Sequence, residues 1–164
     1  MRIRNAKSTD LEQLEQLYEN ARNYMHTHGN PNQWNDGHPN QKDLKEDILK
    51  EQLYIVESVD GIEGAFVYYE GIDPTYIKIE GEWLNEEPYA VLHKVASAGK
   101  KKRIGDTILQ YGIHRSNNVK IDTHADNIPM QKCILRNGFQ YAGIIYLANG
   151  DPRNAYQFSR LEKR

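Results

Sequence analysis

The sequence predicts an α/β fold of the α+β kind, with one mixed, mostly antiparallel central sheet and helices on both of its faces. Segments with apolar residues at helical spacing alternate with β-rich runs, in the order β-α-α-β-β-β-α-β-α-β-β. The chain has the length of one ordinary domain, and no repeat, low-complexity tract or long linker divides it. We therefore expect residues 1–164 to form a single domain. Hydrophobic residues (38%) and charged residues (27%) occur in proportions that exclude a disordered or membrane-resident chain.

The first elements are a short strand over residues 2–5 and a helix after it. Thr9 and Glu12 have the spacing of a capping box, which marks a helix start. Apolar residues then recur every three or four positions from Leu11 to Met25, and Gly29 is expected to end the helix.

Residues 30–41 are rich in Asn, Pro and Gly and are expected to form a loop. Trp34 lies in the middle of this loop. Two roles remain open for its side chain, which either fills a local gap in the core or lines a binding pocket. A second helix is expected over residues 42–51.

The rest of the chain is mostly β-structure with two further helices. Asp60-Gly61 separates two β-rich runs and predicts a hairpin. Residues 71–88 are ambiguous, with a short strand at 76–80 followed by an acidic loop. The remaining expected elements are a buried strand at 89–96, a helix beginning at or just before Gly105, a strand at 119–125, a short helix with Pro129 near its start and Gly138 at its end, and strands at 140–147 and 155–161.

The formal net charge of −2 is unevenly distributed. No acid lies between Glu87 and Asp106, while that stretch contains Lys94 and the basic run 100–103. The near-neutral total argues against a nucleic-acid coat. The basic run stands at the start of a helix, where free backbone N–H groups and the helix dipole favour an anion, so we expect a phosphate-binding site there. A solvated basic turn is the plainer alternative, and neither the Walker A nor the G-x-G-x-x-G pattern is present.

Cys133 is the only cysteine, so the chain forms no internal disulfide, and a reducing compartment fits it better than secretion does. Its thiol is expected to be a small buried hydrophobe rather than a reactive group. The start of the sequence has no signal-peptide pattern, and no apolar run is long enough to cross a bilayer. These observations predict a cytoplasmic protein. The histidines show no metal-ligand spacing, so no metal is expected.

The basic turn resembles the acyl-CoA-binding motif of the GNAT N-acetyltransferases, Q/R-x-x-G-x-G/A. Lys100, Arg103 and Gly105 fall on its three defined positions. Gly105 matches, Lys100 is a basic replacement, and Arg103 stands in place of the middle glycine. A residue other than glycine can serve there if its φ stays negative.

A second segment is similar to the family pattern N-x-x-A-x-x-x-Y-x-K-x-G-F. Asn127, Gly138 and Phe139 match it, and Arg136 stands for the lysine. Met130 replaces the small residue, and Ile134 occupies the tyrosine position. Together with the order of elements, the two segments extend the GNAT resemblance over nearly the whole chain.

The resemblance implies acetyl-CoA as co-substrate and direct attack of an amine on its thioester. It implies that pantetheine pairs along Lys94 and Val95, and that the Val95 N–H donates to the thioester oxygen. The implied cofactor-binding residues are Lys94, Val95, Lys100, Lys101, Lys102, Arg103, Ile104, Gly105, Asp106, Asn127 and Met130. Because Ile134 has no proton to donate, the acid is another tyrosine from the 141–146 strand, a water, or absent.

Three residues compete for the role of general base. Lys120, Asp122 and His124 alternate along one strand and so share a face. Asp122 or His124 could take up the amine proton, and Glu80 is a third candidate. The plainer alternative is that Asp122 and His124 only form structural pairs. His93 is expected to pack or to line the acceptor site.

We therefore expect an N-acetyltransferase that acts on a small-molecule amine, with no nucleic-acid or membrane partner. Trp34, Glu80 and the acidic 80–87 segment are where acceptor selectivity is expected, and the acids favour a cationic acceptor. A non-catalytic acyl-CoA sensor is the main alternative because of Ile134, and a nucleic-acid-binding module is a second one. The last strand is a candidate for pairing with a second copy in a homodimer.

Overall fold

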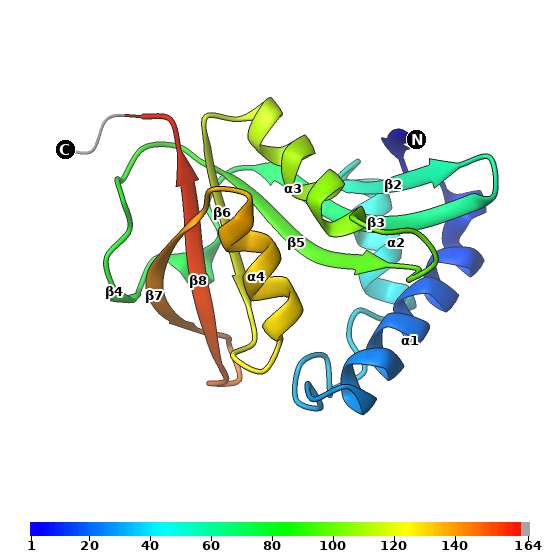
Figure 1. Ribbon diagram of the computed structural model, residues 1–164, viewed down its shortest axis with the longest axis horizontal. Coiled ribbons are helices and arrows are strands. Elements are labelled where there is room, and N and C mark those ends of the chain that lie inside the picture. The colour runs from blue at the N-terminus through cyan, green and yellow to red at the C-terminus, as the bar shows by residue number, and fades with distance from the viewer. Residues whose placement is uncertain (162–164) are drawn as a thin grey trace.

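One sheet of eight strands spans residues 2–159, and the computed structural model describes residues 1–161 of the chain (Figure 1). The strands are β1 (Arg2–Asn5), β2 (Leu53–Ser58), β3 (Gly61–Glu70), β4 (Glu80–Gly81), β5 (Ala90–Ser97), β6 (Asn118–Thr123), β7 (Gln140–Tyr146) and β8 (Pro152–Ser159). The helices are α1 (Leu11–Thr27), α2 (Gln41–Leu49), α3 (Ile104–Arg115) and α4 (Ile128–Arg136), with 3-10 turns at Ser8–Asp10 and Pro74–Tyr76.

The strand order is β1-β2-β3-β5-β6-β8-β7-β4, and β5 and β6 form the one parallel pair among the described strands. Helix α3 makes the crossover between these two strands, as a parallel connection requires. The mixed, mostly antiparallel sheet expected from the sequence is therefore confirmed.

The helices cover both faces of the sheet (Figure 1). Ala65 and Val67 of β3 pack under α1 and α2, while Phe66 and Tyr68, which alternate with them, pack under α3 and α4. A third apolar cluster forms around Tyr76, where residues 71–89 fold over the β6-β8-β7 part of the sheet. Each face of the sheet thus has its own core.

Helix α3 lies close against β3 because Gly64 has no side chain. A Cβ at Gly64 would lie 2.6 Å from Cγ2 of Ile104, the first residue of α3, and 2.8 Å from the carbonyl oxygen of Ala96. This close approach fixes where α3 begins, and hence where the basic turn before it lies.

Three local predictions are wrong. Thr9 and Glu12 do not cap α1, because Asp10 occupies the N-cap and its carboxylate accepts from the N–H of Lys7 and from Arg4. Residues 76–80 do not form a strand, because Asp73 begins a 3-10 turn and only Glu80–Gly81 pair, with β7. The last strand cannot pair with a second copy through its edges, since β8 lies between β6 and β7.

No helix within residues 1–161 is long and apolar enough to cross a membrane. In the same range, no group of three or more His, Cys, Asp or Glu side chains is placed to hold a metal ion.

Candidate active site

The parallel strands β5 and β6 pair only over a short stretch, and a pocket opens where they separate. Pairing ends at Leu92 and Ile121, although β5 continues to Ser97 and β6 to Thr123. The two ribbons diverge beyond that point (Figure 1). The pocket between them has a volume of about 320 Å³, the size of a small-molecule site. Side chains from both sheet faces line it, since Leu92 and His93 alternate along β5.

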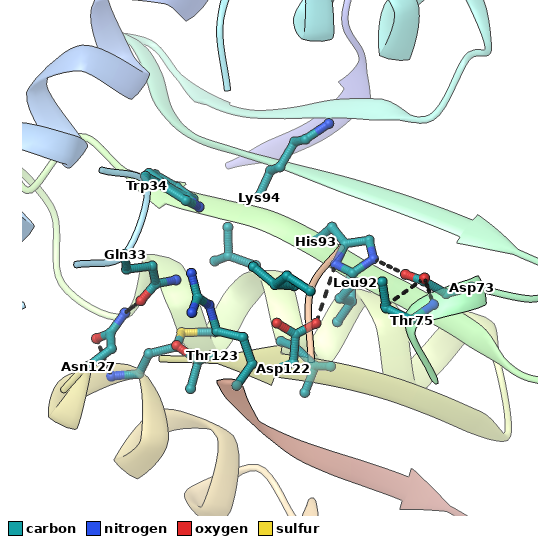
Figure 2. Close-up of a pocket in the computed structure, with 15 residues that line it drawn as sticks. Gln33, Trp34, Asp73, Thr75, Leu92, His93, Lys94, Asp122, Thr123 and Asn127 are labelled. Atoms are coloured by element: carbon teal, nitrogen blue, oxygen red, sulfur yellow. Dashed lines mark hydrogen bonds and ion pairs between the residues drawn. The ribbon is translucent and has the colours of Figure 1, made fainter. Parts of the chain in front are cut away.

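A bulge in β5 shapes one wall of the pocket. The register shifts so that Lys94 and Val95 both lie opposite Phe66, and Lys94 has a φ of 51°. The buried Tyr18 hydroxyl donates to the carbonyl of Lys94 over 2.6 Å, and the Lys94 ammonium lies 2.6 Å from Asp47 Oδ2. The Lys94 side chain therefore points away from the other labelled residues of the pocket (Figure 2). At the bulge, β5 contributes its backbone and Val95 to the pocket wall.

His93 lies between two carboxylates (Figure 2). Its Nε2 is 2.6 Å from Asp73 Oδ2, and its Nδ1 is 3.8 Å from Asp122 Oδ2. All three side chains line the pocket. Asp122 Oδ2 also accepts a 2.6 Å hydrogen bond from the Tyr76 hydroxyl. Burial, together with the neighbouring Asp122, raises the pKa of Tyr76 well above its usual range, so this hydroxyl keeps its proton and remains a donor.

Asp73 stays ionised because several donors converge on it. Burial alone would raise the pKa of this carboxyl, but hydrogen bonds from His93 and from the Thr75 hydroxyl and N–H lower it to about 2. The ionised Asp73 then accepts the Nε2 proton of His93. In the neutral form of the imidazole, the lone pair is then on Nδ1, which faces Asp122.

The loop after α1 closes the opposite end of the pocket. Gln33 Oε1 accepts from the amide of Asn127, over 3.1 Å, and from Asn30. Asn127 in turn caps α4, with its Oδ1 accepting from the N–H of Met130. Trp34 lines the pocket and also packs on Tyr18, with ring centroids 5.7 Å apart, so the two roles left open for it are both realised.

The basic turn before α3 has the features of an anion site, with one difference from expectation. Arg103 at the N-cap has a φ of 65°, so its backbone adopts the left-handed conformation natural to the glycine it replaces. The sequence analysis expected a negative φ for a residue other than glycine at this position, and that expectation was wrong. The first intrahelical bond runs from Thr107 N–H to Arg103, which leaves the N–H groups of residues 104–106 without helix partners.

The side chains around this turn differ in burial and in ion pairing. Ile104 is buried in the core, so only its backbone can contact a ligand. Asp106 is held by Arg136, at 2.8 Å, and by Asn137, which balances an acid that would otherwise repel phosphate. Lys101 pairs with Asp60. Lys100, Lys102 and Arg103 are exposed, and no ion pair within residues 1–161 involves them.

Two predicted site residues are not brought to the pocket. His124 lies past the end of β6, and its Nδ1 accepts from the N–H of Asp126. Burial and the nearby Arg153 lower its pKa. Glu80 is exposed on β4, and the acidic 80–87 segment borders a different hollow. Nor do Tyr141 and Tyr146 reach the pocket, and Ile134 is fully buried in the core.

Sequence reasoning missed several pocket residues, namely Asp73, Thr75, Gln33, Thr123 and Arg153. Asp73 carried a usable signal, because an aspartate directly before a proline is typical of a capped turn. Arg153 carried none, since the last strand was expected to begin only at residue 155.

Comparison with solved structures relates the whole chain to acetyltransferases. A GNAT-family acetyltransferase from Streptococcus agalactiae is 29% identical, with a TM-score of 0.89 over 98% of this chain and 96% of that one. A Staphylococcus aureus protein assigned as an acetyltransferase is 25% identical, with a TM-score of 0.71 over 97% and 99%. The yncA protein of Salmonella typhimurium, solved with its cofactor acetyl-CoA, is 15% identical, with a TM-score of 0.65 over 98% and 94%. Neither a protein-family model nor a curated protein matches the chain. The resemblance found in the sequence is thus confirmed by the architecture, and the chain has the fold of the GNAT acetyltransferases.

Proposed function

We propose that the protein is an acetyl-CoA-dependent N-acetyltransferase for a small amine. The observation that carries the proposal is the pocket between β5 and β6, which combines the bulged backbone at Val95 with the His93–Asp122 pair. A thioester donor on one side and an amine on the other need this combination of groups. The likeness to acetyltransferase structures supports the same reaction class.

The residues near the basic turn fit the phosphates of acetyl-CoA. The backbone N–H groups at the start of α3, the compensated Asp106 and the exposed Lys100, Lys102 and Arg103 together form a site for anions. Met130 and Asn127 line the pocket at the start of α4. When bound, acetyl-CoA supplies an activated acyl carbon. Val95 then serves through its backbone N–H, placed by the bulge to stabilise developing charge on the acyl oxygen.

His93 is the proton acceptor in this proposal, and Asp73 is its positioning residue. The unperturbed pKa of an imidazole, about 6.5, is closer to neutral pH than that of a carboxylate, about 4. Asp122 Oδ2 already accepts a hydrogen bond from the Tyr76 hydroxyl. Asp122 is instead suited to hold the ammonium form of the acceptor and to pass its proton across the 3.8 Å gap to Nδ1.

No tyrosine lines the pocket among the described residues, and the tyrosine position of the family motif is the buried Ile134. The proposal therefore assigns no side chain as acid, and the thiolate leaves with the help of water alone. The same observation favours a second candidate, a protein that binds acyl-CoA without turning it over.

The test has two parts. Acetyl-CoA at a hundredfold excess over its Kd should raise the free energy of unfolding by about 2.7 kcal/mol, which thermal melting detects as a higher Tm. Release of free thiol from acetyl-CoA is then followed with a panel of small amines. Lys102→Glu, which puts a carboxylate on the exposed side of the basic turn, should weaken the melting shift. No shift at millimolar acetyl-CoA would reject both candidates, and a shift without thiol release from any amine would favour the sensor.

The lone Cys133 is buried, and burial raises the pKa of its thiol to about 11. An unreactive thiol is consistent with a reducing compartment, and we keep the cytoplasm as the proposed location.

A further inference from the structure

Arg153 is a buried cation that lines the pocket without an acidic partner. It is 7% exposed, and its side chain donates one hydrogen bond within the described chain, from Nη1 to the carbonyl of Pro152 at 2.8 Å. No carboxylate in residues 1–161 forms an ion pair with it. The nearby Asp151 is hydrogen-bonded to Asn149 instead.

A guanidinium in this state is costly to maintain. Its five N–H groups match the oxygens of a carboxylate or phosphate, and only Nη1 makes a hydrogen bond within the described chain, so the other donors remain available to a ligand. A buried, uncompensated cation that faces a cavity is therefore a feature whose partner is expected to arrive from outside the chain.

The strand pairing places Arg153 on the same side of the sheet as the proton-handling residues. Asp122 of β6 lies opposite Ala155 of β8, and Arg153 is two residues from Ala155 along that strand. Residues two apart share a face and are separated by roughly 7 Å. The pocket thus has a negative end at Asp122 and a positive end at Arg153, within the length of a small molecule.

A second polar group without a partner lines the same pocket. Thr123 follows Asp122 on β6 and pairs with Asn154, the neighbour of Arg153, so its side chain comes from the other face of the sheet. The Thr123 hydroxyl is buried, lines the pocket, and has no hydrogen-bond partner among the described residues. This hydroxyl is free to donate to a polar group of the acceptor.

We infer that the acceptor is an amine that also carries an oxyanion, with the α-amino acids as its simplest form. The inference rests on the proposed acetyl transfer and narrows its acceptor. The ammonium lies at Asp122, from which His93 takes its proton, and the carboxylate binds Arg153. A purely cationic amine, which the acidic 80–87 segment favoured from sequence, would leave Arg153 without its partner.

The experiment compares acceptors that differ only in the carboxylate. L-leucine is paired with isoamylamine and L-phenylalanine with phenethylamine, and thiol release from acetyl-CoA gives kcat/KM for each. We expect each amino acid to exceed its decarboxylated partner by at least tenfold, because a charge-assisted contact is lost in the amine. Arg153→Gln should reduce this ratio to near one, whereas Arg153→Lys should retain part of it.

Calorimetric titration of the same pairs in the presence of CoA gives a readout that is independent of turnover. Tighter binding of the amino acids by tenfold or more, lost in Arg153→Gln, supports the inference even if no thiol is released, in which case the proposed catalysis fails alone. Equal or better binding and turnover of the decarboxylated amines overturns the inference and leaves the acetyltransferase proposal standing.

The stability of Arg153→Met separates ligand binding from a structural role. An unpaired buried cation contributes little to the fold, so this variant should melt at the same temperature as the wild type or higher. A melting temperature lowered by more than about 5 °C would show that Arg153 supports the fold itself and would count against the inference.

Discussion

His93 Nε2 lies 2.6 Å from Oδ2 of Asp73, although the two residues come from a strand and from the 3-10 turn that folds over it. The turn is itself held by that carboxylate, through the N–H and the hydroxyl of Thr75. One carboxylate oxygen of Asp73 orients the His93 ring and selects its tautomer. The other oxygen holds the backbone of the 3-10 turn through Thr75.

Asp73→Asn should lower kcat by roughly 100-fold while changing the acceptor KM little. The amide keeps the Thr75 contacts through its oxygen but presents an NH₂ group to Nε2, which forces the His93 proton to Nδ1 and removes the lone pair that accepts from the amine. Steady-state thiol release measures both parameters. A kcat within twofold of the wild type, in a variant with unchanged melting temperature, would show that the tautomer of His93 does not matter.

Asp122→Asn should lower turnover and leave acetyl-CoA affinity intact, because the carboxylate faces the acceptor and not the basic turn. Tyr76→Phe is the matched comparison, since it removes the 2.6 Å hydrogen bond to the same oxygen and keeps the charge. We expect the loss to be larger in the first variant. Unchanged turnover in Asp122→Asn would remove Asp122 from the proton path and leave His93 to accept the proton directly from the amine.

Arg103→Gly should be more stable than Arg103→Ala by about 1 kcal/mol. Both variants lose the charge, so the difference isolates the backbone, whose φ of 65° suits glycine and strains alanine. Urea unfolding of the pair gives the number. An alanine variant as stable as the glycine variant would mean that residue 103 has a negative φ in solution.

Gly64→Ala should destabilise the protein by about 1–3 kcal/mol, because its Cβ meets Ile104 Cγ2 at 2.6 Å and the Ala96 carbonyl at 2.8 Å. Adding Ile104→Val is expected to recover part of the loss, since it relieves the first contact and not the second. The acetyl-CoA melting shift should shrink as well, because α3 moves. Full recovery in the double variant would place the whole conflict at the side chain.

Lys120 makes stability depend on pH in the alkaline range. Its ammonium lies 4.0 Å from the ring centres of both Trp83 and Tyr89, and burial lowers its pKa to about 8. The unfolded chain keeps this proton up to about pH 10.4 and so binds more protons above pH 8, which means that stability rises with pH there. Urea midpoints at pH 7.5 and 9 should show the rise in wild type and its absence in Lys120→Met. A rise that persists in the variant would assign it to another group.

Much of the fold follows from local patterns in the sequence. The apolar stripe from Leu11 to Met25, the turn at Asp60-Gly61 and the proline at the start of α4 each determine an element through neighbouring residues alone. The segment 71–88 could not be predicted in this way. Its conformation depends on Asp73 and Tyr76, whose partners His93 and Asp122 become neighbours only when the segment lies on the sheet.

The candidate site could be predicted only in part, because some of its residues are brought together by long-range strand pairing. Asp122, Val95 and Trp34 were named from the sequence and line the pocket. The pairing of His93 with Asp122 required knowing that their strands are parallel neighbours, and that β6 ends before His124. Strand alternation alone made His124 as good a candidate for the general base as Asp122.

The separation of β5 from β6 has a consequence for folding as well. It divides the sheet into two antiparallel halves, β1-β2-β3-β5 and β6-β8-β7-β4, joined by main-chain pairing only from Ala90 to Leu92. The pocket occupies the joint, so every ligand that fills it touches both halves and strengthens the weakest part of the sheet. Amide hydrogen exchange at Leu92 and Ile121 should therefore slow on ligand binding more than exchange elsewhere in the two halves. The β5–β6 ladder is then the cooperative unit that gains most stability from the bound substrate.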